Sequence, residues 1–247
     1  MSPCADSLPP MTEKPLTGVA LVTGASKGIG LAIARRLGRM GAKVALCARD
    51  ANRLGQAAEE LKRGGISALA IPTDVTRGEE ITSLVRKTED FLGPIEILVN
   101  NAGIGRFAPL QTATEADWDA ILDTNLKAVF LLSKLVAAGM IERGSGHIIN
   151  IASLAGKSAF AGGGVYCASK WGLLGLTQCM AEDWRPHGIR VCAICPGSVA
   201  TEFSQPGSKD PKKMLQPDDV AHAVETIVTQ APQSFISEVL LRPRQKP

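Results

Sequence analysis

The sequence predicts an α/β fold: a single-domain, doubly wound parallel sheet of about seven strands with helices on both faces. Two observations predict it. From residue 16 onward, short apolar segments alternate with longer segments that have helical apolar spacing. The short segments are continuous apolar runs, which is typical of parallel strands that helices bury on both faces. Because crossover connections are right-handed, this alternation gives a doubly wound sheet.

The predicted strands are the apolar runs, and the predicted helices lie between them. The strands cover residues 18–23, 43–49, 67–72, 95–100, 147–152, 189–195 and 235–243. The helices cover 29–41, 50–63, 76–91, roughly 115–143, a long segment ending near Pro186, and 217–230. Glycines close the first three helices, at Gly41, at Gly64-Gly65 and at Gly93-Pro94, as expected at helix C-termini.

Charge and hydropathy exclude several kinds of partner. Lys and Arg number 27 and Asp and Glu 24, so the net charge of +3 does not indicate nucleic acid or an anionic membrane. No apolar run reaches the ~18 residues of a membrane span. Residues 1–15 are rich in proline and polar groups, which predicts a flexible tail rather than a secretory signal. We therefore expect a cytoplasmic protein with a small-molecule substrate.

The cysteines and histidines do not predict a metal site. Cys192 and Cys195 form a C-x-x-C inside the apolar run IRVCAIC. On a strand, residues three apart point to opposite faces, so the two thiols diverge and a buried apolar role fits better than zinc or redox chemistry. No histidine shares a ligand spacing with another His, Cys or carboxylate. We expect no metal.

A glycine-rich turn, Thr23-Gly-Ala-Ser-Lys-Gly-Ile-Gly30, joins the first strand to the first helix. Its glycines let a ligand approach the backbone, and the helix N-terminus offers free N–H groups to a pyrophosphate. The spacing is G-x-x-x-G-x-G, and an ordinary tight turn would also produce it. With a strand before and a helix after, the turn predicts a dinucleotide site that includes Gly24, Ser26, Lys27, Gly28, Ile29 and Gly30.

Two basic residues bear on which dinucleotide binds. Lys27 lies in the glycine turn, and Arg49 follows the second strand. The strand ends at Ala48, where an acidic residue would hold the ribose hydroxyls and repel a 2′-phosphate. Lys27 and Arg49 can pair with that phosphate, so we predict NADP(H) in preference to NAD(H). Two solvated surface charges are the alternative, and the neighbouring Asp50 weakens the signal.

Ser153, Tyr166 and Lys170 form a candidate catalytic set. Ser153 follows the fifth strand at the carboxyl edge of the sheet, where doubly wound folds bind ligands. Tyr166 and Lys170 share one helix face, four residues apart. A free tyrosine pKa is near ~10, and lowering it by ~3 units needs ~4 kcal/mol of electrostatic help, which a neighbouring ammonium and an oxidised nicotinamide supply. Ser153 can hold the substrate oxygen while the proton moves. This is the only tyrosine in the chain.

These motifs together resemble the short-chain dehydrogenase/reductase family. The Thr23–Gly30 turn, Asn100-Asn101-Ala102-Gly103, Asn125, Ser153, Tyr166-x-x-x-Lys170 and Pro196-Gly197 occur in the family's order. The resemblance covers residues 16–247 and implies one Rossmann-type catalytic and dinucleotide-binding domain. The chain looks most like the branch that contains 3-oxoacyl-(acyl carrier protein) reductases. The resemblance implies an NADP(H)-dependent ketoreductase that interconverts a ketone and a secondary alcohol.

The resemblance also implies roles for single residues. Tyr166 would be the acid/base, Lys170 would hold the ribose and lower the tyrosine pKa, and Ser153 would orient the carbonyl. Asn125 would anchor a water that links Lys170 to solvent. The remaining cofactor contacts would come from Asp74 and Val75 at the adenine, Asn101, Ala102 and Gly103 at the ribose, and Pro196, Gly197, Val199 and Thr201 at the nicotinamide. Asp74 and Asn125 could equally be helix caps or buried hydrogen-bonding groups.

Two regions depart from acyl-carrier-protein reductases. The segment FISEVLLRP, 235–243, is more similar to relatives that act on small hydroxy acids and assorted carbonyls. The polar stretch 202–217 is expected to be a mobile flap over an open substrate site. Its Lys209, Lys212 and Lys213 could attract an acidic carrier or form a solvated loop face. Phe107 and Phe160 could reach the substrate or pack in the core.

Two other function classes fit this sequence less well. A non-catalytic NADPH-binding regulator would need a damaged Ser/Tyr/Lys set, and this set is whole. Nucleic-acid binding lacks both motif and charge. The resemblance implies a homotetramer, or a homodimer, with long helices paired and Trp171 at the contact.

Overall fold

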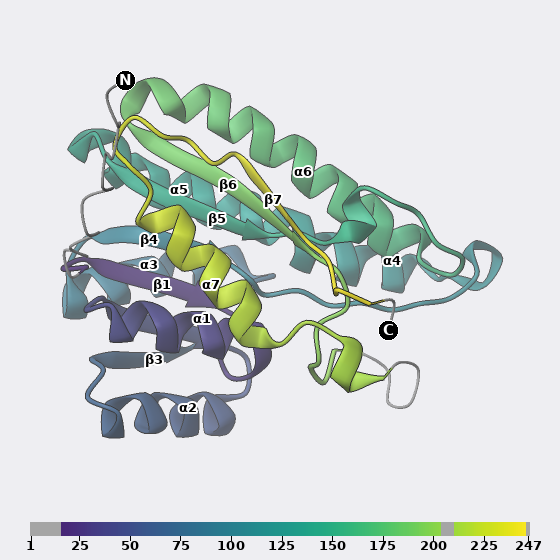
Figure 1. Cartoon of the computed structure of the whole chain (residues 1–247), viewed down its shortest axis with the longest axis horizontal. Helices are drawn as coiled ribbons and strands as arrows, with labels where there is room; N and C mark the ends of the chain where they lie inside the picture. Colours follow the sequence, from purple (N-terminus) through teal and green to yellow (C-terminus); the bar gives the residue numbers. More distant parts are fainter. Residues whose placement is uncertain (1–15, 204–209, 246–247) are drawn as a thin grey trace, which may run out of the picture.

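The computed structural model describes residues 16–203 and 210–245. The predicted tail, 1–15, and Lys209 lie outside these residues. The strands are β1 (Val19–Thr23), β2 (Lys43–Ala48), β3 (Ala68–Pro72), β4 (Ile95–Asn100), β5 (Gly146–Ile151), β6 (Ile189–Pro196) and β7 (Glu238–Leu241). They form one parallel sheet in the order β3-β2-β1-β4-β5-β6-β7, which confirms the predicted seven-stranded, doubly wound fold (Figure 1).

Helices cover both faces of the sheet. They are α1 (Gly28–Arg39), α2 (Ala51–Arg63), α3 (Gly78–Leu92), α4 (Glu115–Leu122), α5 (Ala128–Arg143), α6 (Gly164–Trp184) and α7 (Pro217–Val228). Shorter helical turns are η1 (Leu110–Thr112), η2 (Asp123–Lys127), η3 (Leu154–Gly156), η4 (Arg185–His187) and η5 (Pro211–Lys213). Helices α1, α2 and α7 bury their apolar faces on one side, and α3, α5 and α6 on the other.

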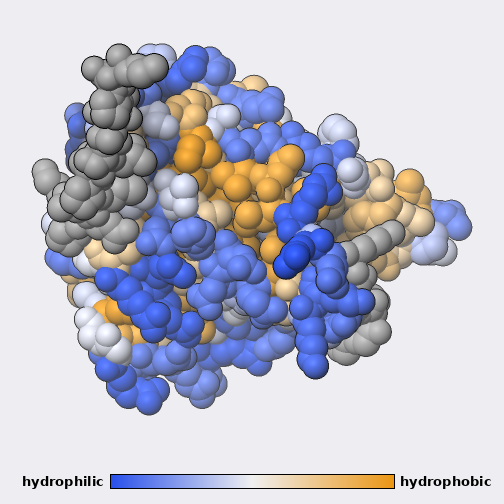
Figure 2. All heavy atoms as spheres, in the orientation of Figure 1, coloured by the Kyte–Doolittle hydropathy of each residue, from blue (hydrophilic) through white to orange (hydrophobic). Residues whose placement is uncertain are grey.

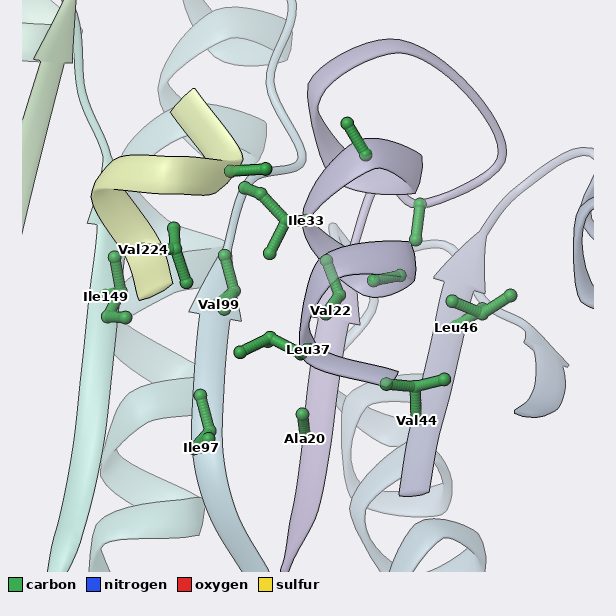
Figure 3. Packing of buried hydrophobic residues seen from close by; sticks show 14 of the residues in the cluster. Ala20, Val22, Ile33, Leu37, Val44, Leu46, Ile97, Val99, Ile149 and Val224 are labelled. Atoms are coloured by element: carbon green, nitrogen blue, oxygen red, sulfur yellow. The ribbon is translucent and has the colours of Figure 1, made fainter. Parts of the chain in front are cut away.

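The core explains why the strands read as continuous apolar runs. Every residue of β1 is buried, because α1 packs on one face and the opposite cluster on the other. Figure 3 shows Ile33 and Leu37 of α1 lying over Val22 and Ala20, and Val224 of α7 lying near Ile149. Full burial of a leucine- or isoleucine-sized side chain contributes about 1.5–3 kcal/mol, so these two layers hold the sheet in place.

Two predicted elements differ from the structure. The helix expected over 115–143 is divided by the π-helical turn η2, which contains Asn125. The last strand is shorter than the predicted 235–243, because it lies at the edge of the sheet and pairs only with β6, over four residues.

Cys192 and Cys195 pack into clusters on opposite faces of β6, as the strand geometry predicts.

The stretch Glu115–Arg143 is long and apolar enough, by composition, to cross a membrane. Here it is a core helix: Leu132, Val136 and Met140 of α5 are buried in the cluster against the sheet. Its outer surface carries Phe130 and Leu135, which are partly exposed. The composition of this segment therefore reflects packing inside a globular domain.

Candidate active site

One large cleft opens at the carboxyl edge of the sheet, with a volume of about 1780 Å³. This is the edge at which doubly wound sheets bind ligands, and the volume exceeds the ~300–1,000 Å³ of a typical small-molecule pocket. All but two of the predicted site residues line it: Gly24, Ser26, Lys27, Gly28, Ile29, Arg49, Asp74, Val75, Asn101, Ala102, Gly103, Ser153, Tyr166, Lys170, Pro196, Gly197, Val199 and Thr201. The two exceptions, Gly30 and Asn125, lie behind its wall.

The glycine turn between β1 and α1 needs its glycines for space and conformation. Gly24 has φ +65°, and a Cβ on it would lie 2.9 Å from the Ala102 Cα. Gly30 does not line the cleft; a Cβ there would lie 2.4 Å from the carbonyl oxygen of Gly24. Gly30 therefore allows α1 to pack closely on the turn, while Gly24 and Gly28 keep the surface open to a ligand.

Asn101 braces this turn rather than presenting its side chain to the cleft. Its Nδ2 donates to the carbonyl oxygens of Thr23 (2.9 Å) and Gly24 (3.2 Å). The Thr23 hydroxyl in turn accepts from the backbone N–H groups of Asn101 and Ala102, both at 3.0 Å. The loop after β4 and the turn after β1 are thus joined by four hydrogen bonds, which fix the shape of the cleft floor.

Two acidic residues near the cleft stabilise local backbone. Asp50 caps the N-terminus of α2, where its carboxylate accepts from the Arg53 N–H at 3.0 Å. Asp74 accepts from the N–H and the hydroxyl of Thr76. Burial raises the pKa of Asp74, but these two hydrogen bonds and the charges of Arg49 and Arg77 outweigh it, so the pKa is lowered. Asp74 is therefore a carboxylate at neutral pH, with Arg49 nearby.

Three charged side chains meet over the glycine turn. Glu202, in the segment after β6, accepts from Lys27 Nζ at 2.5 Å and from Arg53 Nη1 at 3.2 Å. Lys27 and Arg53 hold the pKa of the Glu202 carboxyl below its usual range. One carboxylate oxygen therefore contacts both cations, which shows that Lys27 and Arg53 can converge on a single anionic group.

The end of the cleft formed by η3 and the start of α6 contains the Ser/Tyr/Lys set. Ser153 caps η3, and its hydroxyl accepts from the Ala155 N–H at 3.1 Å. Tyr166 lies in the first turn of α6 and is 8% exposed. Burial raises the pKa of Tyr166 to about 12, although a hydrogen bond with Ser153 lowers it. The expected depression of the tyrosine pKa is not produced by the protein's own groups, because desolvation of the phenolate dominates.

Lys170 sits one helical turn after Tyr166 and is 5% exposed. Its Nζ donates to the Ile151 carbonyl oxygen at 2.9 Å and lies 5.9 Å from the centre of the Tyr166 ring. Burial lowers the pKa of Lys170 to about 8. An amine with this pKa loses its proton as pH rises through 8, so its positive charge is available to a nearby phenolate mainly below that pH.

Asn125 connects two walls of the site from behind. In the π-helical turn η2, its side chain accepts from the Ile104 N–H at 2.8 Å and donates to the Ile104 carbonyl oxygen at 2.9 Å. The same amide donates to Ser169 Oγ, and Ser169 donates to the Tyr166 carbonyl oxygen at 2.7 Å. Asn125 therefore fixes the loop after β4 relative to the start of α6.

The segment after β6 forms another wall of the cleft. The Gly197 N–H donates to the Leu241 carbonyl oxygen at 2.8 Å, and Val199 forms a parallel bridge with Leu215. A Cβ on Gly28 would lie 3.3 Å from the Thr201 methyl group, so this segment crosses directly over the glycine turn. Residues 204–209 of the predicted flap lie outside the described residues; Lys212 and Lys213 form the exposed turn η5.

Known proteins match this chain closely. A family model described as short chain dehydrogenase matches residues 18–212. The chain belongs to the short-chain dehydrogenase family. It is 43% identical over 186 residues to gluconate 5-dehydrogenase of Gluconobacter oxydans, covering 75% of this chain and 73% of that protein. It is 41% identical to the ketoacyl reductase HetN of Nostoc sp., covering 75% of this chain and 65% of that protein.

A much longer relative and a solved structure also match this chain. The chain covers only 20% of glycine betaine reductase ATRR of Emericella nidulans, to which it is 35% identical. Among solved structures, a metagenomic short-chain oxidoreductase in complex with NADP has a TM-score of 0.83 and 45% identity, covering 94% of this chain and 99% of that one. The predicted family and Rossmann-like fold are thus confirmed.

The site of this short-chain dehydrogenase fits a dinucleotide on the geometry of its own residues. Gly24 and Gly28 both have a positive φ, where a side chain would be strained, so the turn presents bare backbone to the cleft. Beside it, Lys27, Arg49 and Arg53 line the same cleft and offer positive charge to phosphate. At the other end, Tyr166 and Lys170 line the cleft next to the ends of β5 and β6.

Sequence reasoning missed Arg53, Glu202 and Phe203, which also line the cleft. Arg53 had one recognisable signal, because it stands three residues after the capping Asp50 and so lies in the first turn of α2, at the same edge as Arg49. Glu202 and Phe203 begin the stretch 202–217 that was expected to cover the substrate site, but nothing in the sequence singled them out, since their contacts come from segments more than thirty residues away. Phe107 and Phe160, left open between core and cleft, both line the cleft.

Proposed function

We propose that this chain is an NADP(H)-dependent oxidoreductase that interconverts a ketone and a secondary alcohol. The observation that carries the proposal is the joint placement of Ser153, Tyr166 and Lys170 at one end of a cleft whose other end is the glycine turn. When bound, NADPH would supply the hydride that reduces the carbonyl carbon. The protein's contribution is to hold the carbonyl oxygen and to deliver a proton to it.

Ser153 and Tyr166 act on the carbonyl oxygen. The Ser153 and Tyr166 hydroxyls line the same cleft, and Ser153 lies near enough to Tyr166 to lower its pKa, so a substrate oxygen placed between them would accept from both. Because burial keeps the pKa of Tyr166 at about 12, this phenol is protonated at neutral pH and is ready to donate. A carbonyl oxygen that gained negative charge on reduction would take the phenolic proton, which would leave an alcohol and a tyrosinate.

Lys170 and Asn125 support this proton transfer. Lys170 Nζ, fixed on the Ile151 carbonyl oxygen, places an ammonium near the tyrosinate that the transfer creates. Lys170 would also hold the nicotinamide ribose hydroxyls. Asn125 acts as a positioning residue, because its amide pins the Ile104 backbone and, through Ser169, the first turn of α6.

The preference for NADP(H) over NAD(H) rests on the cations at the adenosine end. Lys27 and Arg53 already share one anionic oxygen, that of Glu202, and Arg49 lines the same region of the cleft. Ala48 ends β2 without a carboxylate that would repel a 2′-phosphate. We assign the 2′-phosphate to Lys27, Arg49 and Arg53, the adenine to Asp74 and Val75, and the nicotinamide to the wall formed by Pro196, Gly197, Val199 and Thr201.

Two narrower substrate classes fall within this proposal, a 3-oxoacyl thioester and a small hydroxy acid. The relatives' names include both a ketoacyl reductase and a gluconate dehydrogenase. Arg242, exposed at the cleft, is the residue that would pair with the carboxylate of an acidic substrate. A panel of acetoacetyl thioester, 2-oxo acids and neutral ketones separates these classes by rate.

The experiment that tests the proposal is NADPH consumption with this panel, run in parallel with NADH. We expect turnover with at least one ketone and a higher kcat/KM for NADPH than for NADH. Tight NADPH binding without turnover of any carbonyl compound would instead support a non-catalytic NADPH-binding regulator. Equal kcat/KM for the two cofactors would contradict the NADP(H) preference.

We also propose that the acting unit is a cytoplasmic homotetramer, or a homodimer. Apolar surface is exposed on α6, at Trp171, and on two helices that contact α6, at Trp118 on α4 and at Phe130 and Leu135 on α5. Such surface is typical of subunit contacts. The described cysteines Cys47, Cys167, Cys179, Cys192 and Cys195 are free thiols, which suits a reducing compartment. Light scattering of the purified protein tests the assembly; a monomeric mass would contradict it.

A further inference from the structure

Phenylalanine rings from separate segments gather around Tyr166 at the catalytic end of the cleft. The Phe107 ring packs edge-on against the Tyr166 ring, with 5.5 Å between ring centres, and Phe160 lies 5.7 Å from Phe107. The Phe203 ring lies 5.9 Å from the Tyr166 ring on a third segment. These separations are those of attractive aromatic pairs. The proposed proton donor is therefore bordered by phenyl groups.

The backbone is shaped to hold these rings together. The Ala108 N–H donates to the Gly162 carbonyl oxygen at 2.9 Å, which joins the loop after β4 to the loop before α6. A Cβ on Gly105 would lie 2.8 Å from the Cζ atoms of both Phe107 and Phe203. Glycine at this position therefore lets the tips of two rings from distant segments approach one point.

The rings remain partly exposed although they cluster. Phe107 is 38%, Phe203 46% and Phe160 48% exposed, and the neighbouring Leu110 is 68% exposed. Figure 2 shows hydrophobic residues on the projection at the right of the molecule, where Figure 1 places the loops after β4 and after β5. Contiguous apolar surface that lines a cleft is the kind of surface that a ligand covers.

Several charged side chains of the cleft are paired or buried away from the rings. Lys27, Arg53 and Glu202 pair over the glycine turn, and Lys170 is buried on the Ile151 carbonyl oxygen. Arg242 lies on a different segment from the rings, directly after β7, whose Leu241 carbonyl oxygen accepts from the Gly197 N–H. A substrate group that lay among the three rings would meet hydrocarbon rather than charge.

From these contacts we propose that the substrate is a ketone carrying a phenyl-sized apolar group, which packs among Phe107, Phe160 and Phe203 while its carbonyl reaches Tyr166. The inference rests on the proposed function and adds the substrate class to it. A polyhydroxy acid in the same place would leave its hydroxyl groups without hydrogen-bond partners against the rings. An apolar group instead gains from burial against aromatic surface.

Three unconjugated methyl ketones test this inference with NADPH: benzylacetone, butanone and levulinate. They share the reacting group and differ in carrying a phenyl ring, a bare chain or a carboxylate. We expect kcat/KM for benzylacetone to exceed that of the other two by about ten-fold or more. Equal values would overturn the aromatic pocket and leave the ketoreductase function standing. A preference for levulinate would show that Arg242 binds the substrate carboxylate, and it would also overturn the aromatic pocket. No turnover with any carbonyl compound would reject the proposed ketoreductase function itself.

Variants locate the effect. Phe160 contacts Phe107 and, among the ring pairs found, not Tyr166, so Phe160→Ala should lower the benzylacetone-to-butanone ratio of kcat/KM by about 3–10-fold, through KM. Phe91→Ala removes an exposed ring on α3, which is outside the cleft, and should leave the ratio unchanged. Equal losses on both ketones in Phe160→Ala would indicate a structural role and contradict the proposal.

A binding measurement gives an answer independent of turnover. Saturation-transfer NMR on the protein with NADP⁺ and benzylacetone should show transfer to the phenyl protons stronger than to the methyl protons. Phe203→Ala and Phe160→Ala should each weaken the phenyl signal, whereas Phe91→Ala should not. Phenyl transfer that is unaffected by both cleft variants would place the ring elsewhere and overturn the inference.

Discussion

The two ends of the cleft are built on different physics. At the end that we propose binds adenosine, the side chains of Lys27, Arg53 and Glu202 are 48%, 46% and 64% exposed, and their ion pairs lie in water. At the catalytic end, Tyr166 and Lys170 are 8% and 5% exposed. Exposed ion pairs contribute about 0–1 kcal/mol and are screened by salt, whereas burial has moved the pKa of both catalytic groups. Substitutions at the end with Tyr166 and Lys170 should therefore change activity far more than substitutions at the end with Lys27 and Arg53.

Tyr166→Phe should have the largest effect. It removes the proton donor and keeps the ring that packs against Phe107 and Phe203. We expect kcat to fall by about 10³-fold or more while NADPH affinity changes little. Steady-state kinetics measures kcat, and fluorescence titration measures the affinity for NADPH. Retention of most of the activity would end the assignment of Tyr166 as the acid.

Lys170 should determine the pH dependence of the free enzyme. Its pKa of about 8 means that the ammonium is lost as pH rises through 8, while Tyr166 keeps its proton up to about 12. In the reduction direction, kcat/KM should therefore be level below pH 8 and fall about ten-fold per unit above it. Lys170→Arg should move this fall to higher pH, because a guanidinium stays charged. A profile identical in both proteins would exclude Lys170 as the titrating group.

Lys27→Ala and Arg53→Ala should have a smaller, cofactor-specific effect. Each removes one cation proposed to bind the 2′-phosphate, so KM for NADPH should rise by about 3–10-fold while KM for NADH stays the same. The NADPH effect should shrink as salt is added. Arg35→Ala is the control, since Arg35 pairs with Glu60 away from the cleft. Equal increases for both cofactors would contradict the phosphate assignment.

Glu202→Gln should have the smallest effect and the opposite sign. The neutral amide no longer competes for Lys27 and Arg53, so NADPH should bind about 2–5-fold more tightly at low salt. Glu60→Gln, which changes an exposed carboxylate on α2 bonded to Arg35, serves as the matched control. Weaker NADPH binding in Glu202→Gln would show that the carboxylate helps to hold the cofactor instead.

Local patterns were enough to predict the sheet and most of the cleft. The strands β1 to β6 are continuous apolar runs because both faces are covered, and chain order places the turns after β1, β4, β5 and β6 at one edge. The glycine turn, Ser153, Tyr166 and Lys170 follow directly from that placement. This is why eighteen predicted residues line one cleft.

Features that depend on distant segments were not predictable. The π-helical turn around Asn125 breaks a segment whose apolar composition is helical throughout, and its hydrogen bonds to Ile104 and Ser169 arise only in the folded chain. Asn101 lines the cleft, but the hydrogen bonds from its side chain to the Thr23 and Gly24 carbonyl oxygens could not be predicted from the sequence. The raised pKa of Tyr166 follows from burial, which depends on the packing of the surrounding rings and strands.

The central claim is that one buried phenol, held neutral by the protein, donates the proton. Because the chain has a single tyrosine, ¹³C NMR of protein labelled at tyrosine Cζ reads Tyr166 alone. The protein without cofactor should keep the neutral phenol signal at pH 10, and added NADP⁺ should lower the pH at which the phenolate appears. A tyrosine that titrates near its ordinary ~10 and does not respond to NADP⁺ would contradict the account.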